Sequence, residues 1–346
     1  MNNAEKEIIP VTPFETIYQK YTAMCENPLL LVPTHLKDES TTASLLGGLT
    51  NQNYLVESTK SESKYVLHVL NPGLRHFLNR PVVRPEGLPG PTTILTTESV
   101  LLEEFVPNKG PLGQLPENSF EHLAKILATI HRSTGVTVPE QKSGSEPKIQ
   151  RFLQNIRAVE QDIMVRIAKL EDKSYYAEVV RELVNDSELL RKSLNQLPQD
   201  IVYCHNDFNL SNILELEAET DRQRFGGPFL LVDYEYAGWN YRCFDIANFL
   251  HESECRFYDD APYFDLIDEF HQGNPDGGES FLKEYYRQSG IGTSYSEFAA
   301  VSRKAKIYSL YFWLLLAIHE APGGWQGTKR YVELKLESYR RLRDAL

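Results

Sequence analysis

The spacing of hydrophobic residues changes character about a third of the way along the chain. Between about residues 45 and 106, short apolar or alternating runs are separated by glycine and proline, which is typical of β-strands and turns. From residue 119 onward, apolar residues recur at the i, i+3, i+4 and i+7 positions of amphipathic helices. The pattern predicts an α+β protein with two lobes, a small β-rich lobe over residues 1–106 and a larger, mostly helical lobe over residues 107–346.

The same pattern predicts individual elements. LLGGLTNQNYLVES predicts two strands around a glycine turn, KYVLHVL a third strand, and TTILTTESVLLEEFV a hairpin. Five prolines between residues 71 and 91 oppose a long helix, so this part of the first lobe is expected to be shortened and irregular. In the second lobe we expect helices, including all of residues 244–346, interrupted only by the strand-like runs IVYCHND and FLLVDYEY.

Charge and composition exclude several classes of protein. The 346 residues carry a formal charge of −12, which disfavours binding to nucleic acid or to an anionic membrane. The longest apolar run, residues 310–318, has about half of the ~20 residues that cross a bilayer, so no membrane span is expected. The chain starts without the basic and apolar regions of a secretory signal, and its four cysteines show no CxxC spacing. We therefore expect a cytoplasmic protein with reduced thiols.

The strongest chemical signal is the octet HNDFNLSN, which follows an apolar run and has the form H-x-D-x-x-x-x-N. It contains Asp207 and Asn212, and Asp233 follows 21 residues after Asn212. Phosphoryl transfer uses one carboxylate to accept a hydroxyl proton, and an amide with a second carboxylate to hold Mg²⁺ at the phosphates. We expect Asp207 to be the base and Asn212 and Asp233 to be metal ligands. The alternative is a loop in which Asn and Asp only form turns.

A glycine-rich turn in the first lobe is the second signal. Residues 46–53, LGGLTNQN, lie between two strand-like runs. Gly47 and Gly48 would let backbone N–H groups approach phosphates, and Thr50 or Asn51 could donate hydrogen bonds to them. The motif is weak by itself, because a plain hairpin turn has a similar composition.

In this order, GGLTNQNYLV, LLEEFVPN, YCHNDFNLSNIL, LLVDYEYAGWNYRCFDIANFLHE and the aromatic C-terminal helix resemble the choline/ethanolamine kinase family. The similarity extends from about residue 44 to 340, and its central segment is more specific than the octet, which aminoglycoside phosphotransferases share. The resemblance implies a protein-kinase-like bilobal fold that uses ATP and Mg²⁺ to phosphorylate the hydroxyl of choline or ethanolamine, the first step of phospholipid synthesis by the CDP pathway. The implied partner is a small-molecule amino alcohol, and the sequence is compatible with a homodimer.

The resemblance also implies roles for individual residues. The family's base falls on Asp207 and its metal ligands on Asn212 and Asp233, in agreement with the spacing argument. Its phosphate loop falls on residues 47–51, and its interlobe strand falls on residues 103–107. Backbone groups of Glu104 and Val106 would contact adenine there, and the amine pocket maps to Tyr236, Glu252, Trp313 and Tyr331.

Such a pocket suits a cation, because aromatic faces attract an ammonium group by about 0.5–2 kcal/mol each and a carboxylate adds to the attraction. The alternative is that Tyr236 and Trp313 are ordinary core residues. Asp245 is expected either to cap its helix or to brace the catalytic loop by hydrogen bonds. His205 is expected to be a structural, hydrogen-bonding histidine rather than a base.

The sequence departs from the family pattern at three places. His68 stands where an arginine or lysine normally reaches the nucleotide phosphates, and it would stabilise them less; alternatively, it faces solvent. The helix that normally carries an acidic partner is replaced by a proline-broken segment, in which Glu86 is the only carboxylate between residues 80 and 91. Leucines occupy residues 314–316, where a second tryptophan is expected, and this slightly favours ethanolamine over choline.

Two other functions stay open on the sequence. One is a kinase of another small alcohol, such as an aminoglycoside or a sugar. The other is a pseudokinase that binds nucleotide with little turnover, which His68 and the missing helix suggest. The intact Asp207, Asn212 and Asp233 argue against a pseudokinase.

Overall fold

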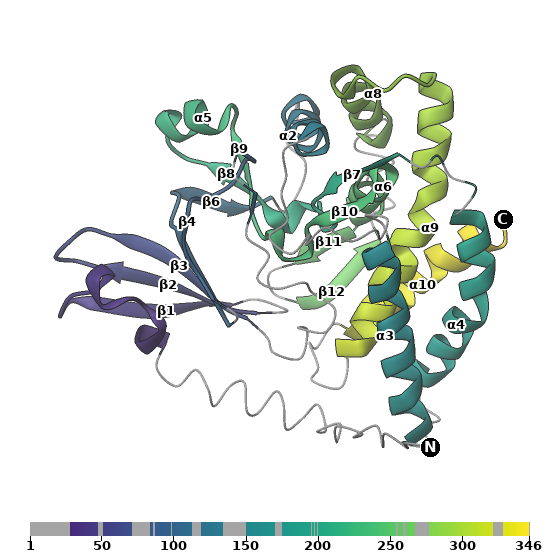
Figure 1. Ribbon diagram of the computed structural model, residues 1–346, viewed down its shortest axis with the longest axis horizontal. Helices are drawn as coiled ribbons and strands as arrows, with labels where there is room; N and C mark the ends of the chain where they lie inside the picture. Colours follow the sequence, from purple (N-terminus) through teal and green to yellow (C-terminus); the bar gives the residue numbers. More distant parts are fainter. Residues whose placement is uncertain are drawn as a thin grey trace, which may run out of the picture.

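The computed structural model has a β-rich N-terminal part beside a largely helical C-terminal part (Figure 1). The expected α+β class is confirmed. The structure describes residues 28–47, 51–70, 84, 85, 87–97, 99–112, 119–133, 150–169, 175–194, 196, 198, 200–253, 255–258, 261–266, 277–320 and 328–345.

A five-stranded antiparallel sheet of order β1-β2-β3-β5-β4 forms the N-terminal part. Leu67 lies opposite both Leu102 and Tyr54, and Leu67, Leu102 and Val56 form a small buried core on one face of the sheet. Both predicted hairpins and the predicted third strand are confirmed. The strands are β1 (Thr41–Gly47), β2 (Gln52–Ser58), β3 (Lys64–Val69), β4 (Thr93–Thr96) and β5 (Val100–Glu104), preceded by the 3-10 helices η1 (Pro28–Leu31) and η2 (Thr34–Leu36).

The proline-rich segment between β3 and β4 is described only in part. Residues 84, 85 and 87–92 contain no helix, as the prolines predict. Residues 71–83 and Glu86 lie outside the described residues, as do Gly48 and Thr50 of the glycine turn.

The C-terminal part is built around α9, which contacts α3, α4, α6, α8 and α10. The long apolar run lies in this helix, and Leu310, Leu314 and Leu315 are buried among its neighbours, as expected for a core helix. Within the described ranges, no helix is both long and apolar enough to cross a membrane. The helices are α2 (Phe120–Arg132), α3 (Gln150–Lys169), α4 (Tyr175–Leu194), α5 (Glu219–Phe225), α6 (Arg242–Glu252), α8 (Gly277–Ser289), α9 (Tyr295–Glu320) and α10 (Thr328–Arg343).

Short strands interrupt the helices more often than the pattern predicted. The two expected strands are present as β7 and β9, but the prediction of helices throughout residues 244–346 is wrong, because β11 and β12 form a hairpin there. Strands of three to six residues are too short for periodicity to separate them from a helical turn. The small sheets have the orders β6-β8-β9, β10-β7 and β11-β12. Their strands are β6 (Asn108–Pro111), β7 (Ile201–Cys204), β8 (Ile213–Leu216), β9 (Phe229–Leu231), β10 (Gly238–Tyr241), β11 (Cys255–Tyr258) and β12 (Ala261–Leu266).

Candidate active site

The catalytic loop predicted from the octet, residues 205–212, connects β7 to β8 and ends in the short 3-10 helix η4 (Leu210–Asn212). Asp207 Oδ1 accepts a hydrogen bond from Asn209 Nδ2, and Asp207 Oδ2 accepts one from Asn212 Nδ2, both at 2.7 Å. Asn209 also caps η4, because its Oδ1 accepts from the backbone N–H groups of Ser211 and Asn212. The loop therefore holds the Asp207 carboxylate in a defined orientation and brings Asn212 to it.

The Asp207 carboxyl group is buried and feels the negative charge of two other carboxylates. The pKa of Asp207 is raised well above its usual value, first by burial and then by the charges of Asp233 and Glu252, while the bonds from Asn212 and Asn209 oppose the rise. Asp233 follows β9 and has a φ of 63°, a left-handed conformation that Asp tolerates better than most residues. Carboxylate and amide oxygens in a cluster of negative charge are the donors that Mg²⁺ prefers, so the residues present fit this ion.

Asp245, in α6, braces the catalytic loop. Its two carboxylate oxygens accept hydrogen bonds from the backbone N–H of His205 at 2.7 Å and from that of Asn206 at 2.6 Å. His131 Nε2 lies 3.0 Å from Asp245 Oδ2, and the Asp245 side chain is 0% exposed. The bracing alternative is confirmed, and the capping alternative is wrong, because Tyr241 occupies the N-cap of α6.

His131, Cys204 and Asp245 offer ligand atoms within 4.8 Å of one another, but this buried cluster does not have the character of a metal site. Burial raises the pKa of the Cys204 thiol well above its usual value, which opposes the thiolate that a metal requires. The Asp245 oxygens already accept backbone hydrogen bonds. Burial also lowers the pKa of His131, and its Nδ1 lies 2.5 Å from the hydroxyl of Tyr285. We therefore interpret the cluster as the structural support of the loop.

His205 and Asn206 tie the catalytic loop to the segment around Asp233. His205 Nδ1 accepts from the Asp207 N–H at 3.3 Å, so the ring proton is on Nε2, which donates to Val232 O at 3.0 Å. The expectation of a structural histidine is confirmed. Asn206 has a φ of 66°, donates to Tyr236 O and accepts from Asn240 Nδ2. Sequence reasoning missed Asn206 and Asn240; polar residues within otherwise buried runs were the available signal.

The glycine turn contacts the C-terminal part through Asn51. Asn51 is buried, and its Nδ2 donates to Glu235 Oε2 at 2.7 Å. Glu235 lies in η5 (Tyr234–Tyr236), whose N-cap is Asp233, so this bond ties Asn51 to the segment that carries one of the predicted metal ligands. Gly47 ends β1 and lies opposite Asn53 of β2. Sequence reasoning did not identify Glu235.

His68 lies between its cross-strand neighbours in the N-terminal sheet. Its Nδ1 is 2.9 Å from Asn53 Oδ1, its Nε2 is 3.3 Å from Glu103 Oε2, and its side chain is only 15% exposed. The alternative in which His68 faces solvent is therefore wrong. Burial by itself would lower the pKa of His68, but Glu103, Asp233 and Glu235 outweigh burial and raise it. An acidic partner is thus supplied by β5, although sequence reasoning searched for it only in the segment after β3.

The segment between the two parts of the molecule contains Glu104 and Val106. The Glu104 carboxylate accepts two hydrogen bonds from Arg224 in α5, at 2.5 and 3.1 Å, and one from the Thr92 N–H at 2.7 Å. Burial would raise the pKa of Glu104, but these bonds outweigh it and lower the pKa. Val106 is buried, and its carbonyl accepts from Asn108 Nδ2. Arg224, which sequence reasoning missed, therefore links α5 to the N-terminal sheet.

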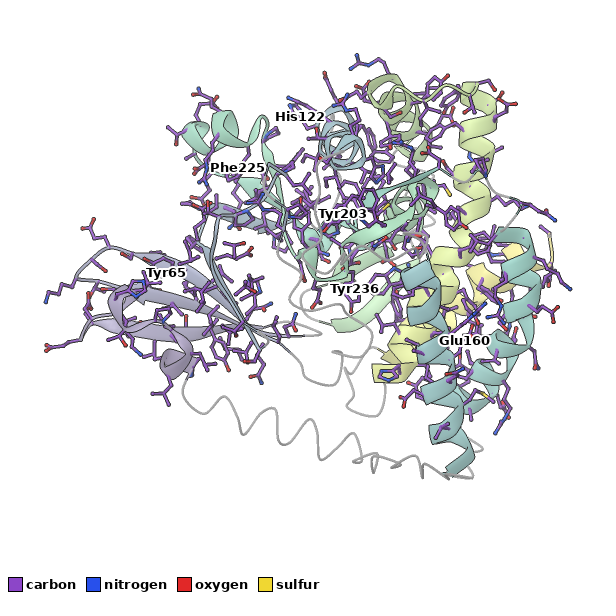
Figure 2. The ribbon with its side chains drawn as sticks, in the orientation of Figure 1. Tyr65, His122, Glu160, Tyr203, Phe225 and Tyr236 are labelled. Carbon is purple, nitrogen blue, oxygen red and sulfur yellow. The ribbon has the colours of Figure 1, made fainter. Side chains whose placement is uncertain are left out.

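The four residues of the predicted amine pocket form two pairs. The ring centroids of Tyr236 and Trp313 are 5.2 Å apart, with an angle of 66° between the ring planes. Figure 2 labels Tyr236 near the centre of the molecule, between the N-terminal sheet and the C-terminal helices. Both rings are partly exposed and pack against the core that contains Tyr331, so neither is fully buried in it. In the second pair, Tyr331 OH donates to Glu252 Oε1 at 3.3 Å.

Comparisons with known proteins identify relatives of this chain. Residues 42–344 match the family model of choline/ethanolamine kinase. The chain is 26% identical over 265 residues to choline kinase B1 of Caenorhabditis elegans, an alignment that covers 72% of this chain and 67% of that protein. It is 31% identical over 172 residues to choline kinase alpha of Mus musculus, which covers 47% of this chain and 35% of that protein. The alignments thus span about two thirds of the first relative and about a third of the second.

A crystal structure of choline kinase from Cryptosporidium parvum Iowa II has a similar fold, with a TM-score of 0.61 and 16% sequence identity. The match covers 95% of this chain and 96% of that one. The expected bilobal fold of the protein-kinase type is therefore confirmed, and so is the resemblance that the motifs carried.

Proposed function

The chain belongs to the choline/ethanolamine kinase family, and we propose that it transfers the γ-phosphoryl group of ATP to the hydroxyl of choline or ethanolamine. One observation carries the proposal: Asn209 and Asn212 orient the buried carboxylate of Asp207, whose pKa is raised by burial and by the charges of Asp233 and Glu252. A site with this much negative charge suits both a metal–nucleotide complex and a cationic acceptor.

Asp207 acts as the base in this proposal. Its carboxylate, held by Asn209 and Asn212, accepts the proton of the amino-alcohol hydroxyl while the hydroxyl oxygen attacks the γ-phosphorus in line and ADP leaves. Asn212 and Asp233 would hold Mg²⁺, which neutralises charge on the phosphates when bound.

The nucleotide is assigned to the N-terminal lobe, residues 1–106. We propose that the turn formed by Gly47, Gly48, Thr50 and Asn51 covers the phosphates and that His68 adds positive charge beside them. The raised pKa of His68 supports this role, because its protonated form is favoured by the surrounding carboxylates. Backbone groups of Glu104 and Val106 would contact adenine in the segment that leads into the second lobe, residues 107–346.

The ammonium group is assigned to Tyr236, Glu252, Trp313 and Tyr331. The Tyr236–Trp313 pair supports this assignment, because two partly exposed rings at an angle offer π-faces to a cation. We also propose a cytoplasmic location, where ATP and the reduced thiols of the buried Cys204 and Cys243 occur together. A homodimer stays a prediction.

The test is ADP release from Mg²⁺-ATP with choline and ethanolamine in parallel. Asp207→Ala should lower kcat by about 10²–10⁴-fold, because it removes the base, while Asp344→Ala, an exposed carboxylate at the end of the chain, serves as the matched control. A thermal melt of each variant separates lost chemistry from lost folding. Turnover only with an aminoglycoside or a sugar, or nucleotide binding without any turnover, would contradict the proposal.

A further inference from the structure

Lys335, in α10, is a buried lysine that the proposed chemistry does not use. Its side chain is 2% exposed, and its Nζ lies 3.0 Å from Glu252 Oε1, 2.9 Å from His251 Nδ1 and 3.3 Å from His251 O. The ammonium group also lies 5.4 Å from the centroid of the Tyr331 ring. Burying a lysine is costly unless it is paired, so these contacts account for its position and suggest a specific task.

The first task concerns the carboxylate of Glu252. In the described part of the chain, Glu252 Oε1 lies 3.0 Å from Lys335 Nζ and accepts a hydrogen bond from Tyr331 OH at 3.3 Å. These two side chains of α10 hold Oε1, so Oε2 is the oxygen that would meet a substrate cation.

The second task concerns a chain of buried hydrogen bonds that starts at Lys335. A lysine ammonium can only donate, so His251 Nδ1 must accept, and the ring proton is on Nε2. Nε2 then donates to Ser309 Oγ at 2.9 Å, Ser309 donates to Asn248 Oδ1 at 3.0 Å, and Asn248 Nδ2 donates to Phe208 O at 3.3 Å.

The direction of this chain is consistent with the charge of its histidine. Burial and the nearby Lys335 and Lys306 place the pKa of His251 well below its usual value, so the ring is neutral, as the chain requires. His251, Ser309 and Asn248 are all buried, so water does not offer them alternative partners. The chain ends on the carbonyl of the residue that follows the base Asp207.

We propose that Lys335 is a positioning residue that anchors Glu252 for the substrate ammonium and, through His251, Ser309 and Asn248, holds the catalytic loop at Phe208. The proposal rests on the proposed function, since it assigns Glu252 and Asp207 their roles in that reaction. Its two branches predict different kinetic effects, because one ends at the amine pocket and the other at the base.

Steady-state kinetics with choline and ethanolamine separates the branches. Lys335→Met keeps the length of the side chain but removes both anchors, so it should raise the KM for the amino alcohol at least about tenfold and also lower kcat. Ser309→Ala breaks only the chain to the loop and should lower kcat with the amino-alcohol KM unchanged. Lys335→Arg should restore part of the loss, and Lys283→Met, at an exposed lysine of α8, is the matched control. The KM for ATP should stay unchanged in all four.

Lys335→Met leaves Glu252 buried without its cation and can fail to fold, so the double variant Lys335→Met/Glu252→Gln is prepared with it. The double variant should melt at a higher temperature than Lys335→Met alone. It should still show the raised KM for the amino alcohol. The proposal is overturned if the folded single or double variant keeps KM and kcat within about twofold of the wild type.

Nitrogen-15 spectra of the histidine rings give a readout that does not need turnover. The wild-type protein should show His251 as the neutral Nε2–H form, and Lys335→Met or the double variant should lose this single form. A wild-type chain inactive on both amino alcohols refutes the proposed function, whereas a His251 proton on Nδ1, or a cationic ring, refutes the positioning role of Lys335.

Discussion

Replacing Asp245 by asparagine tests how strongly the catalytic loop depends on its brace. The carboxylate is fully buried, and its two oxygens accept from the N–H groups of His205 and Asn206 and lie beside His131 Nε2. The asparagine has nearly the same shape but only one oxygen. His131 can adapt by moving its proton to Nδ1 and accepting from the new amide, but one of the two backbone N–H groups loses its acceptor.

The cost follows from these contacts. A buried N–H left without a partner costs about 1–3 kcal/mol, and replacing charged by neutral acceptors weakens the other bonds by roughly 1 kcal/mol. We therefore expect Asp245→Asn to lower the free energy of unfolding by about 2–4 kcal/mol. With an unfolding entropy of about 2.1 cal/mol/K per residue, a chain of 346 residues should then melt roughly 3–6 °C lower.

Thermal melts and initial-rate kinetics check this expectation together. A displacement of the loop by 1 Å can cost about 10²-fold in rate, so kcat should fall much more than the KM for ATP rises. Asp344→Asn is the control, because that side chain is 69% exposed and its pair with Arg343 contributes less than about 1 kcal/mol. A wild-type melting temperature and kcat in Asp245→Asn would refute the bracing argument.

Three further outcomes are expected. His68→Ala should raise the KM for ATP several-fold with the amino-alcohol KM unchanged, because it removes a group that Glu103 and neighbouring carboxylates favour in its cationic form; an unchanged ATP KM would contradict this. Glu182→Gln should lower the free energy of unfolding at pH 7 by less than about 1 kcal/mol, and urea unfolding at a series of falling pH values should show the difference shrink. The bond from Arg340 depresses the pKa of Glu182 below its ordinary 4.5, so this stabilisation is present above that value and is lost as the pH falls through the lowered pKa. Chelation with EDTA should abolish ADP release and added Mg²⁺ should restore it, whereas full activity in EDTA would exclude the proposed metal site.

Local features of the sequence were enough for much of the architecture. The two hairpins of the N-terminal sheet, the amphipathic α2 and the apolar α9 each follow from the spacing of residues within one segment. The octet likewise placed Asp207 and Asn212 on one short loop, where Asn212 now contacts the Asp207 carboxylate. These predictions succeeded because the partners are close in sequence, so a pattern of a few residues determines the geometry.

The sequence by itself therefore determined the α+β class, the order of the motifs and the family, since each of these depends on local spacing and residue type. Only the tertiary structure decided which charges meet. The Asn51–Glu235 bond joins residues 184 positions apart, and the bond between Lys335 and His251 joins residues 84 positions apart. Neither partner carries a local signal of the other, because such pairs form only when packing of the helices and sheets removes water and brings distant side chains into contact.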